Sequence, residues 1–414
     1  MFEDLGLSTA DKERILREVS VVFNAAANVK FDLTLKEAVN INTVGIINVL
    51  NFVKQLPHLV SFIHISTAYS HLKNSVLEEK GYPSPISPET MIENVKNMSE
   101  EALEEMKPKI LQGLPNTYTL SKALSEDLVR RSGLPAGIAR PSIVIASWKE
   151  PAPGWVDNVN GPTGLMVGAG KGVLRSMLCN GDYVLNVIPC DMAINAIIVF
   201  AWKIGREKPT EPVFMNVTNA LENPISWRFA VDVGKKYAIE YPFTGILWYP
   251  GGSLTTSKVY HYIRIILFQY LPAFLIDGLM VLSGNKPFLV NIQHKVNNGV
   301  KIVKYYTTKE WVFRQDRMKA LELELNPSDR EEFFMDTTVI NWDTYMLQYI
   351  LGTRKYCLKD DPSTLPRARK VMGYLYYADW ILKIGLITLF IWFAYSWINS
   401  NRIITTTAFE VNEI

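Results

Sequence analysis

In the first 150 residues, some segments show the pattern of apolar and polar positions typical of strands and others the pattern typical of helices. Short runs rich in β-branched residues at 21–23, 59–65 and 136–139 predict strands, whereas the segment 37–54 carries a helical pattern. A charged stretch over 88–112 predicts further helix. Strands that alternate with helices form parallel sheets with crossover helices. We therefore expect an α/β fold with a doubly wound, Rossmann-like parallel sheet.

The pattern changes near Pro250, where long aromatic-rich helical stretches begin to follow one another without strand alternation. We expect an α/β domain over residues 1–250 and a separate helical domain over residues 251–375. Within the second domain, the apolar stretch 263–282 is interrupted by a proline and two charged residues. That interruption favours a core helix or a membrane-surface helix.

The apolar stretch 380–398 near the C-terminus predicts a transmembrane helix. Its nineteen residues, at about 1.5 Å each, approach the roughly 30 Å of a bilayer core. Aromatic residues stand at both of its ends. Basic residues are more frequent on its N-terminal side, from Arg367 to Lys383, than beyond it. We expect a single-pass protein whose main domain lies in the cytosol.

Charge and cysteine content exclude several classes of protein. The 43 Lys and Arg residues nearly balance the 41 Asp and Glu residues, so no strong field attracts nucleic acid or an anionic membrane surface. Attachment to membrane lipid must then be hydrophobic. Three cysteines without a CxxC pair, and no histidines at zinc spacing, predict neither a disulfide framework nor a metal site. The oligomeric state is left open by the sequence.

The candidate chemistry centres on Tyr118 and Lys122. Four residues apart on a predicted helix, they share one face, where an ammonium group favours the ionised form of a phenol. Such a phenol can donate a proton near neutral pH. The same spacing occurs in two other Tyr–Lys pairs, which begin at Tyr69 and Tyr305. Context favours Tyr118 and Lys122, because they lie on a predicted helix that follows a loop. A strand that ends in hydroxyl groups precedes this helix.

That strand, in FIHISTAYS, ends at two candidate hydroxyl donors. A carbonyl oxygen gains negative charge as the carbonyl is reduced, and a hydroxyl placed opposite the phenol supplies a second hydrogen bond to it. We assign this role to Thr67, with Ser66 as the second choice, although Thr67 could also merely cap the strand. His64 alternates into the strand and is interpreted as a packed core histidine.

Several segments carry a resemblance to a known family: FNAAANVKFD, AVNINTVG, FIHISTAYS, YTLSK, ARPSIV, PGWVDNVNGPTGLMVGAGKGVLRSM and PCDMAINA. The second half continues it with YYTTKEWVF and INWDTYMLQYILGTRKYCLKDDPSTLP. With these segments the sequence resembles an extended short-chain dehydrogenase/reductase, and within that group the fatty acyl-CoA reductases. The resemblance covers nearly the whole chain, and several segments are distinctive of the family.

The resemblance implies reduction of a long-chain fatty acyl-CoA by NADPH, through an aldehyde, to a primary alcohol. It makes Tyr118 the general acid, Lys122 the residue that binds the nicotinamide ribose and tunes the phenol, and Thr67 the group that holds the carbonyl oxygen. It also implies a location in the endoplasmic reticulum or the peroxisome.

The resemblance further implies a set of cofactor-binding residues. Ala25 and Ala26 would line the cofactor in the turn after the first predicted strand. Asn42 would brace the neighbouring strand and helix, and Pro141 and Ser142 would border the nicotinamide.

A dinucleotide-binding sheet carries a glycine-rich turn after its first strand, where backbone N–H groups meet the pyrophosphate. The sequence contains no such turn, and GAGKG at 168–172 lacks the required spacing. The resemblance begins shortly before a fourth strand, so we expect the first three strands to be missing. The strand at 21–23 would then be an exposed edge, and the chain alone would bind NADPH weakly and have little reductase activity. Asn24 and Asn28 replace the family's usual histidine and threonine, which bears on cofactor affinity.

Two alternative functions remain open. A hydroxysteroid dehydrogenase/isomerase shares the fold and the Tyr–Lys pair, but the segment PGWVDNVNGPTG and the long helical second half argue against it. A non-catalytic, membrane-anchored protein that binds acyl groups or other proteins would explain the missing glycine-rich turn.

Overall fold

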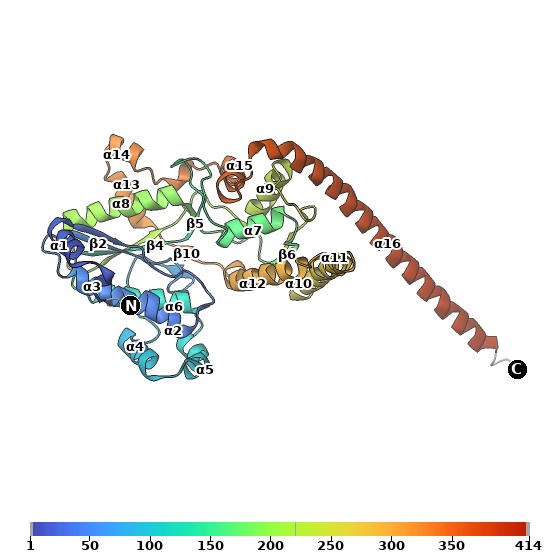
Figure 1. The fold of residues 1–414 in the computed structure, drawn as a ribbon, viewed down its shortest axis with the longest axis horizontal. Helices are drawn as coiled ribbons and strands as arrows, with labels where there is room; N and C mark the ends of the chain where they lie inside the picture. Colours follow the sequence, from blue (N-terminus) through green and yellow to red (C-terminus); the bar gives the residue numbers. More distant parts are fainter. Residues whose placement is uncertain (1–2, 220, 411–414) are drawn as a thin grey trace.

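The computed structural model describes residues 3–219 and 221–410, with side chains described up to residue 398. Its central sheet has four strands in the order β1-β2-β4-β8, all paired in parallel (Figure 1). These strands are β1 (Val21–Asn24), β2 (Ser61–Ile65), β4 (Ala136–Pro141) and β8 (Val213–Val217). The doubly wound parallel sheet predicted from the sequence is confirmed, and β1, β2 and β4 fall on the three predicted strands.

Helices cover both faces of this sheet. On one face pack α1 (Thr9–Glu18), α3 (Gly45–Val53) and α6 (Thr117–Arg130), and on the other lies α8 (Cys190–Glu207). Neighbouring residues of a strand point to opposite faces, so Phe62 of β2 packs with α3 and α6 while Ile63 packs with α8. Both side chains are fully buried. This two-sided burial explains why the strands read as continuous apolar runs.

The helix predicted over 37–54 is confirmed as a continuous helical segment in three parts. It runs through α2 (Leu35–Ala38), the π-helical turn η2 (Val39–Val44) and α3. A capping box of Thr34 and Glu37 begins it. The charged stretch forms α4 (Pro88–Asn97) and α5 (Glu100–Leu111), separated where Ser99 caps the second helix. A π-helical turn inside a helix is rare and often marks a functional site.

β1 lies at the edge of the central sheet. Among the residues that the structure describes, it pairs with β2 only. Val21 is 39% exposed and Phe23 is 45% exposed. The expected exposed edge strand is therefore confirmed.

The second half of the chain contains short strands that the sequence pattern did not predict. β9 (Ser253–Thr255) pairs with β6 (Ser176–Leu178), and β10 (Val312–Phe313) pairs with β3 (Val76–Leu77). The expectation of helices without strands beyond Pro250 is wrong in this respect, because strands of two or three residues are too short to show an alternating pattern. The division into domains near Pro250 stays a prediction.

Further α-helices and one π-helical turn lie between residues 161 and 352. They are α7 (Gly161–Gly170), α9 (Trp227–Glu240), α10 (Lys258–Ile265), η3 (Ile266–Tyr270), α11 (Leu271–Leu282), α12 (Leu289–Thr307), α13 (Asp316–Leu323), α14 (Pro327–Glu332) and α15 (Trp342–Gly352). One more strand pair, β5 (Ile143–Ile145) with β7 (Val187–Pro189), follows β4 directly. The chain ends in α16 (Leu365–Glu410), which projects far from the rest of the molecule (Figure 1).

Two helices in the described part of the chain are long and apolar enough to cross a membrane, judged by length and composition alone. One spans residues 362–398 and includes most of α16, and the other spans 258–282 through α10, η3 and α11. Apolar side chains point outward from both, for example Phe390 and Leu279. Because the second helix exposes so much apolar surface, its interpretation as a core helix is wrong, and the membrane-surface interpretation remains.

Candidate active site

Tyr118 lies in the first turn of α6, next to an aromatic wall. Asn116 caps the helix by accepting a hydrogen bond from the Thr119 N–H at 2.9 Å. The same Asn116 donates to the hydroxyl of Tyr306, on α12, at 2.9 Å. The ring of Phe31 packs against both Tyr118 and Tyr306, at 5.5 and 5.7 Å between centroids. Burial in this pocket raises the pKa of Tyr118 to about 12.

Lys122 follows one helical turn later, and its side chain extends to the end of β2. It is only 3% exposed, and its Nζ donates to the carbonyl oxygen of Ile65, the last residue of β2, at 2.7 Å. Burial lowers the pKa of Lys122 to about 8. Burial, not Lys122, sets the direction of the shift in the pKa of Tyr118, and the expectation that the Lys122 ammonium tunes the phenol stays a prediction.

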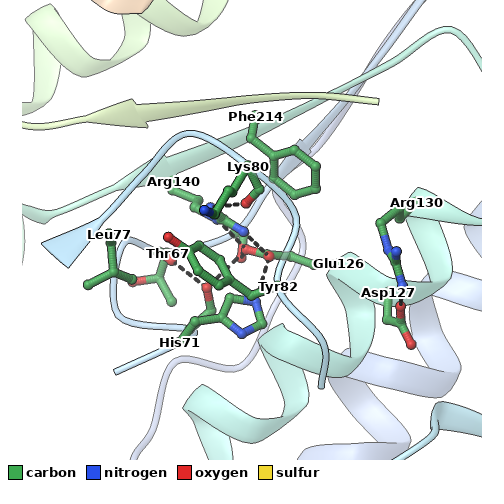
Figure 2. A network of polar contacts seen from close by, with 12 residues as sticks. Thr67, His71, Leu77, Lys80, Tyr82, Glu126, Asp127, Arg130, Arg140 and Phe214 are labelled. Carbon is green, nitrogen blue, oxygen red and sulfur yellow. Dashed lines mark hydrogen bonds and ion pairs between the residues drawn. The ribbon is translucent and has the colours of Figure 1, made fainter. Parts of the chain in front are cut away.

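Glu126, one turn further along the same face of α6, is the centre of a buried polar network (Figure 2). Arg140 of β4 donates to both of its carboxylate oxygens, at 2.9 and 2.6 Å. His71 contacts it at 2.9 Å, and the hydroxyl groups of Ser66 and Ser70 donate to it at 2.5 and 3.0 Å. Although burial acts in the opposite direction, Arg140 and His71 hold the pKa of Glu126 well below its usual range. The network joins α6, β4 and the segment after β2.

The Arg140 guanidinium completes this network. It is fully buried, and the rings of Tyr82 and Phe214 lie 5.6 and 4.6 Å from it (Figure 2). Sequence reasoning missed both Glu126 and Arg140. The available signals were the position of Glu126 four residues after Lys122 and the arginine inside the quoted segment ARPSIV.

The two candidate hydroxyl groups at the end of β2 differ in their contacts. Ser66 gives its only hydroxyl proton to the Glu126 carboxylate, so it has none left for a substrate. The Oγ1 of Thr67 accepts from the Tyr69 N–H at 3.3 Å, and among the described residues its own proton has no acceptor. The Ala68 N–H donates to the Pro141 carbonyl at 2.9 Å, which places Thr67 beside the end of β4.

Asn42, in the π-helical turn, ties the loop after β1 to α6. Its Oδ1 accepts from the Asn28 N–H at 2.8 Å, and its Nδ2 donates to the Asn28 carbonyl at 3.0 Å and to the Ser121 hydroxyl at 2.9 Å. The loop held in this way contains Ala25 and Ala26. Its cofactor role stays a prediction.

His64 lies in the core of the sheet and is assigned no catalytic role. It is 2% exposed, and its Nδ1 contacts the side-chain nitrogen of Asn24 at 3.0 Å. Burial lowers its pKa to about 3, so the ring is neutral. The interpretation as a packed core histidine is confirmed. Asn24 thus turns toward the core histidine.

The predicted site residues converge on one edge of the sheet. Ala25 follows β1, Thr67 follows β2 and Ser142 follows β4, and the carboxyl ends of parallel strands form the ligand-binding edge of such sheets. The Ser142 Oγ is buried without a hydrogen-bond partner among the described residues, which is costly unless a ligand meets it. An orphaned hydroxyl, a buried ammonium and a phenol fit the nicotinamide and ribose of a dinucleotide.

A parallel sheet with these groups at its carboxyl edge defines the class of nicotinamide-dependent oxidoreductases. Residues 1–197 match an NAD-binding family model described as male sterility protein, and residues 268–360 match a second model with the same description. Relatives with curated names then give the particular family: the chain belongs to the fatty acyl-CoA reductases. This membership decides against the hydroxysteroid alternative.

Two relatives show the extent of the match. The chain is 34% identical over 378 residues to fatty acyl-CoA reductase 1 of Gallus gallus, covering 90% of this chain and 73% of that protein. It is 34% identical over 368 residues to fatty acyl-CoA reductase wat of Drosophila melanogaster, covering 88% and 71%. Among solved structures, the terminal R domain of the myxalamid PKS-NRPS pathway shares the fold, with a TM-score of 0.51, 14% identity and coverage of 86% and 73%.

Proposed function

We propose that this protein reduces long-chain fatty acyl-CoA thioesters to primary alcohols with NADPH, and that Tyr118, Lys122 and Thr67 carry the reaction. The proposal is supported by the contact of Lys122 with the last residue of β2 and by the position of Thr67 beside the end of β4, with Tyr118 one helical turn before Lys122 on α6. Family membership supports the substrate and the nicotinamide cofactor, and the resemblance supports NADPH as its form.

The proposed chemistry assigns one task to each side chain. The reduced nicotinamide, when bound beside Pro141 and Ser142, supplies the hydride. Thr67 donates a hydrogen bond to the carbonyl oxygen as negative charge develops there. Tyr118 gives its proton to that oxygen when the thioester is reduced; the C–S bond then breaks, and CoA leaves as the thiol with the hydroxyl proton, which yields the aldehyde. Tyr118, reprotonated from solvent, gives a second proton when the aldehyde is reduced to the alcohol. Lys122 stabilises the phenolate left behind and holds the ribose.

The experiment uses the full chain in detergent with palmitoyl-CoA. NADPH oxidation is followed by absorbance, and products are separated by gas chromatography. Because the chain alone is expected to bind NADPH weakly, the nucleotide is supplied in large excess; we expect two NADPH consumed for each alcohol formed, and slower reduction with NADH. One NADPH consumed for each aldehyde would contradict the alcohol product. No oxidation of either nucleotide would support the non-catalytic alternative.

Thr67 and Ser66 can be separated by substitution. We expect Thr67→Val to lower kcat by about 10²–10³-fold, because an isosteric side chain removes one donor to the developing charge. Ser66→Ala should leave kcat within a few-fold and lower stability by about 1–3 kcal/mol, since Glu126 loses a buried donor. Steady-state kinetics and thermal unfolding of both variants measure this. A larger loss of kcat in Ser66→Ala would reverse the assignment.

For attachment, the proposal is that residues 380–398 cross a membrane of the endoplasmic reticulum or peroxisome once, with the reductase domain (1–250) and the helical domain (251–375) in the cytosol. The exposed apolar side chains of α16 support this. At the base of α16, Asp379 accepts from the Trp248 Nε1 at 2.7 Å and pairs with Arg175 at 3.2 Å, which anchors the helix to the body.

The anchor gives a further prediction. Leu389→Lys with Phe390→Lys should release the protein from membranes on alkaline carbonate extraction, because each lysine near the centre of a span costs about 2.5–3.5 kcal/mol. Leu323→Lys is the control, because Leu323 is as exposed as Phe390, at 74%, but lies in α13; it should leave the protein in the membrane pellet. Release of the unsubstituted protein by carbonate would contradict the span.

A further inference from the structure

An apolar cavity, lined by residues between Ile145 and Tyr349, lies apart from the polar groups of the active site. Its volume is about 1050 Å³, counting the space at its mouth, and it is enclosed by α7, α9, α15, β6 and β9. Its walls include Leu165, Met166, Met177, Trp227 and Met346. A cavity with such apolar walls suits an apolar ligand.

Most polar groups in the cavity wall are satisfied elsewhere. The Tyr345 hydroxyl donates to the Ala146 carbonyl at 2.5 Å, and the Tyr349 hydroxyl contacts Thr163 at 2.6 Å, so both rings face the cavity without a free polar tip. The Ser176 hydroxyl contacts His261 at 2.9 Å. Lys235 and Ser253 are further polar members of the wall. Water finds few partners in such a space, whereas a hydrocarbon chain needs none.

One end of the cavity is connected by the chain to the active site. Ile145 lines the cavity and follows Ser142 by three residues along β5, which is roughly 10 Å at 3.3 Å per residue. Val187 of the paired strand β7 lines the cavity too, opposite Ile143. A ligand with its reacting carbon beside Thr67 can therefore extend its other end into the cavity.

The opposite wall leads toward the apolar surface of the molecule. Ser253 and Leu254 of β9 line the cavity, and the chain continues from them into α10. That helix begins the segment 258–282, which exposes apolar side chains along its length. The cavity thus lies between the candidate active site and a surface suited to membrane lipid.

We infer that this cavity holds the hydrocarbon tail of the fatty acyl group, with the carbonyl end at Tyr118 and Thr67, and that α9 and α15 limit the length of chain accepted. The identity of the ligand rests on the function proposed above. Gly234 of α9 is the key position, because a Cβ there would stand 3.3 Å from the terminal methyl group of Met346 on α15. Ala230, one helical turn earlier, lines the same wall.

The test narrows the cavity from α9. Gly234→Leu and Ala230→Leu add apolar bulk inside it, and Asp232→Leu adds the same side chain to the exposed opposite face of the helix as a control. Binding is measured on the full chain in detergent, without NADPH, by displacing cis-parinaric acid with acyl-CoAs of increasing length. Burial of each methylene group should raise affinity roughly fourfold.

For the unsubstituted protein and Asp232→Leu, we expect affinity to rise up to long chains. In the two cavity variants it should stop rising at a shorter length, with short-chain binding unchanged. The same dependence on length in all four folded proteins would overturn the inference. Length-dependent binding without any NADPH oxidation would keep the assignment of the cavity and reject the proposed reductase activity.

A second measurement does not depend on how the leucine variants fold. A palmitoyl-CoA analogue with a diazirine at the end of its acyl chain is photolysed on the unsubstituted protein, and the labelled peptides are identified by mass spectrometry. Label in α7, α9 or α15 supports the assignment. Label confined to α10 and α11 would place the tail on the outer surface and overturn it.

Discussion

Tyr118→Phe is expected to lower kcat for NADPH-dependent reduction of palmitoyl-CoA by about 10²–10⁴-fold, with little change in the affinity for NADPH. The substitution removes the proton that the carbonyl oxygen must receive, while the ring keeps its packing against Phe31. The phenol is protonated at neutral pH, and burial raises its pKa above the ordinary value, so the proton to be donated is present before the reaction begins.

Tyr305→Phe is the matched control, because Tyr305 also precedes a lysine by four residues. Its ring stacks on Trp311 at 5.6 Å, and the Lys309 ammonium lies 4.1 Å above it. Both contacts survive loss of the hydroxyl, and kcat should stay within twofold or so of the unsubstituted value. Steady-state kinetics of both variants measure the two values of kcat and so test whether Tyr118 donates the proton. Equal losses of kcat, or retention of most activity by Tyr118→Phe, would show that another group donates the proton.

Glu126→Leu is expected to lower the free energy of unfolding by about 3–5 kcal/mol, the largest effect on stability of any single substitution proposed for this chain. It leaves the fully buried Arg140 without a counter-charge. The double variant Glu126→Leu/Arg140→Met should recover part of the loss, since an apolar pair can replace a buried ion pair. Denaturant unfolding followed by circular dichroism measures both. Glu222→Gln, in an exposed pair with Lys319, should cost less than about 1 kcal/mol.

The shifted pKa of Glu126 also predicts how the free energy of unfolding depends on pH. The folded-state pKa of Glu126 lies well below its usual range, whereas an unfolded glutamate titrates near about 4.3. The unfolded state therefore binds the proton first, and the stabilisation is fully present above that pH and is lost as pH falls through the folded-state pKa. Glu126→Leu should flatten the acid limb of the stability profile. A profile unchanged by the substitution would place the acid sensitivity in other groups.

Local sequence was sufficient to locate most elements around the site. The apolar run before His64 predicted β2, because a strand covered by helices on both faces must be apolar throughout. Asn116 was a recognisable helix cap since its side chain acts on the backbone three residues away. The spacing of Tyr118 and Lys122 and the strand end at Thr67 belong to the same kind of short-range information.

The short strands and the cavity were beyond such reasoning. β9 and β10 each pair with a segment far away in the sequence, and neither is long enough to show an alternating pattern. The cavity is formed where α7, α9 and α15 meet, so it cannot be predicted from the sequence of any single segment.

By itself, the sequence determined the doubly wound sheet, the Tyr118–Lys122 pair and the hydroxyl cluster, since each follows from residues close together in the chain. Only the tertiary structure decided which hydroxyl is free and how acidic the phenol is. Ser66 is occupied by Glu126, 60 positions further on, and Tyr118 is half-buried beside an aromatic wall of Phe31 and Tyr306, the latter from α12. Hydrogen-bond partners and burial depend on contacts between distant segments, and these exist only after folding.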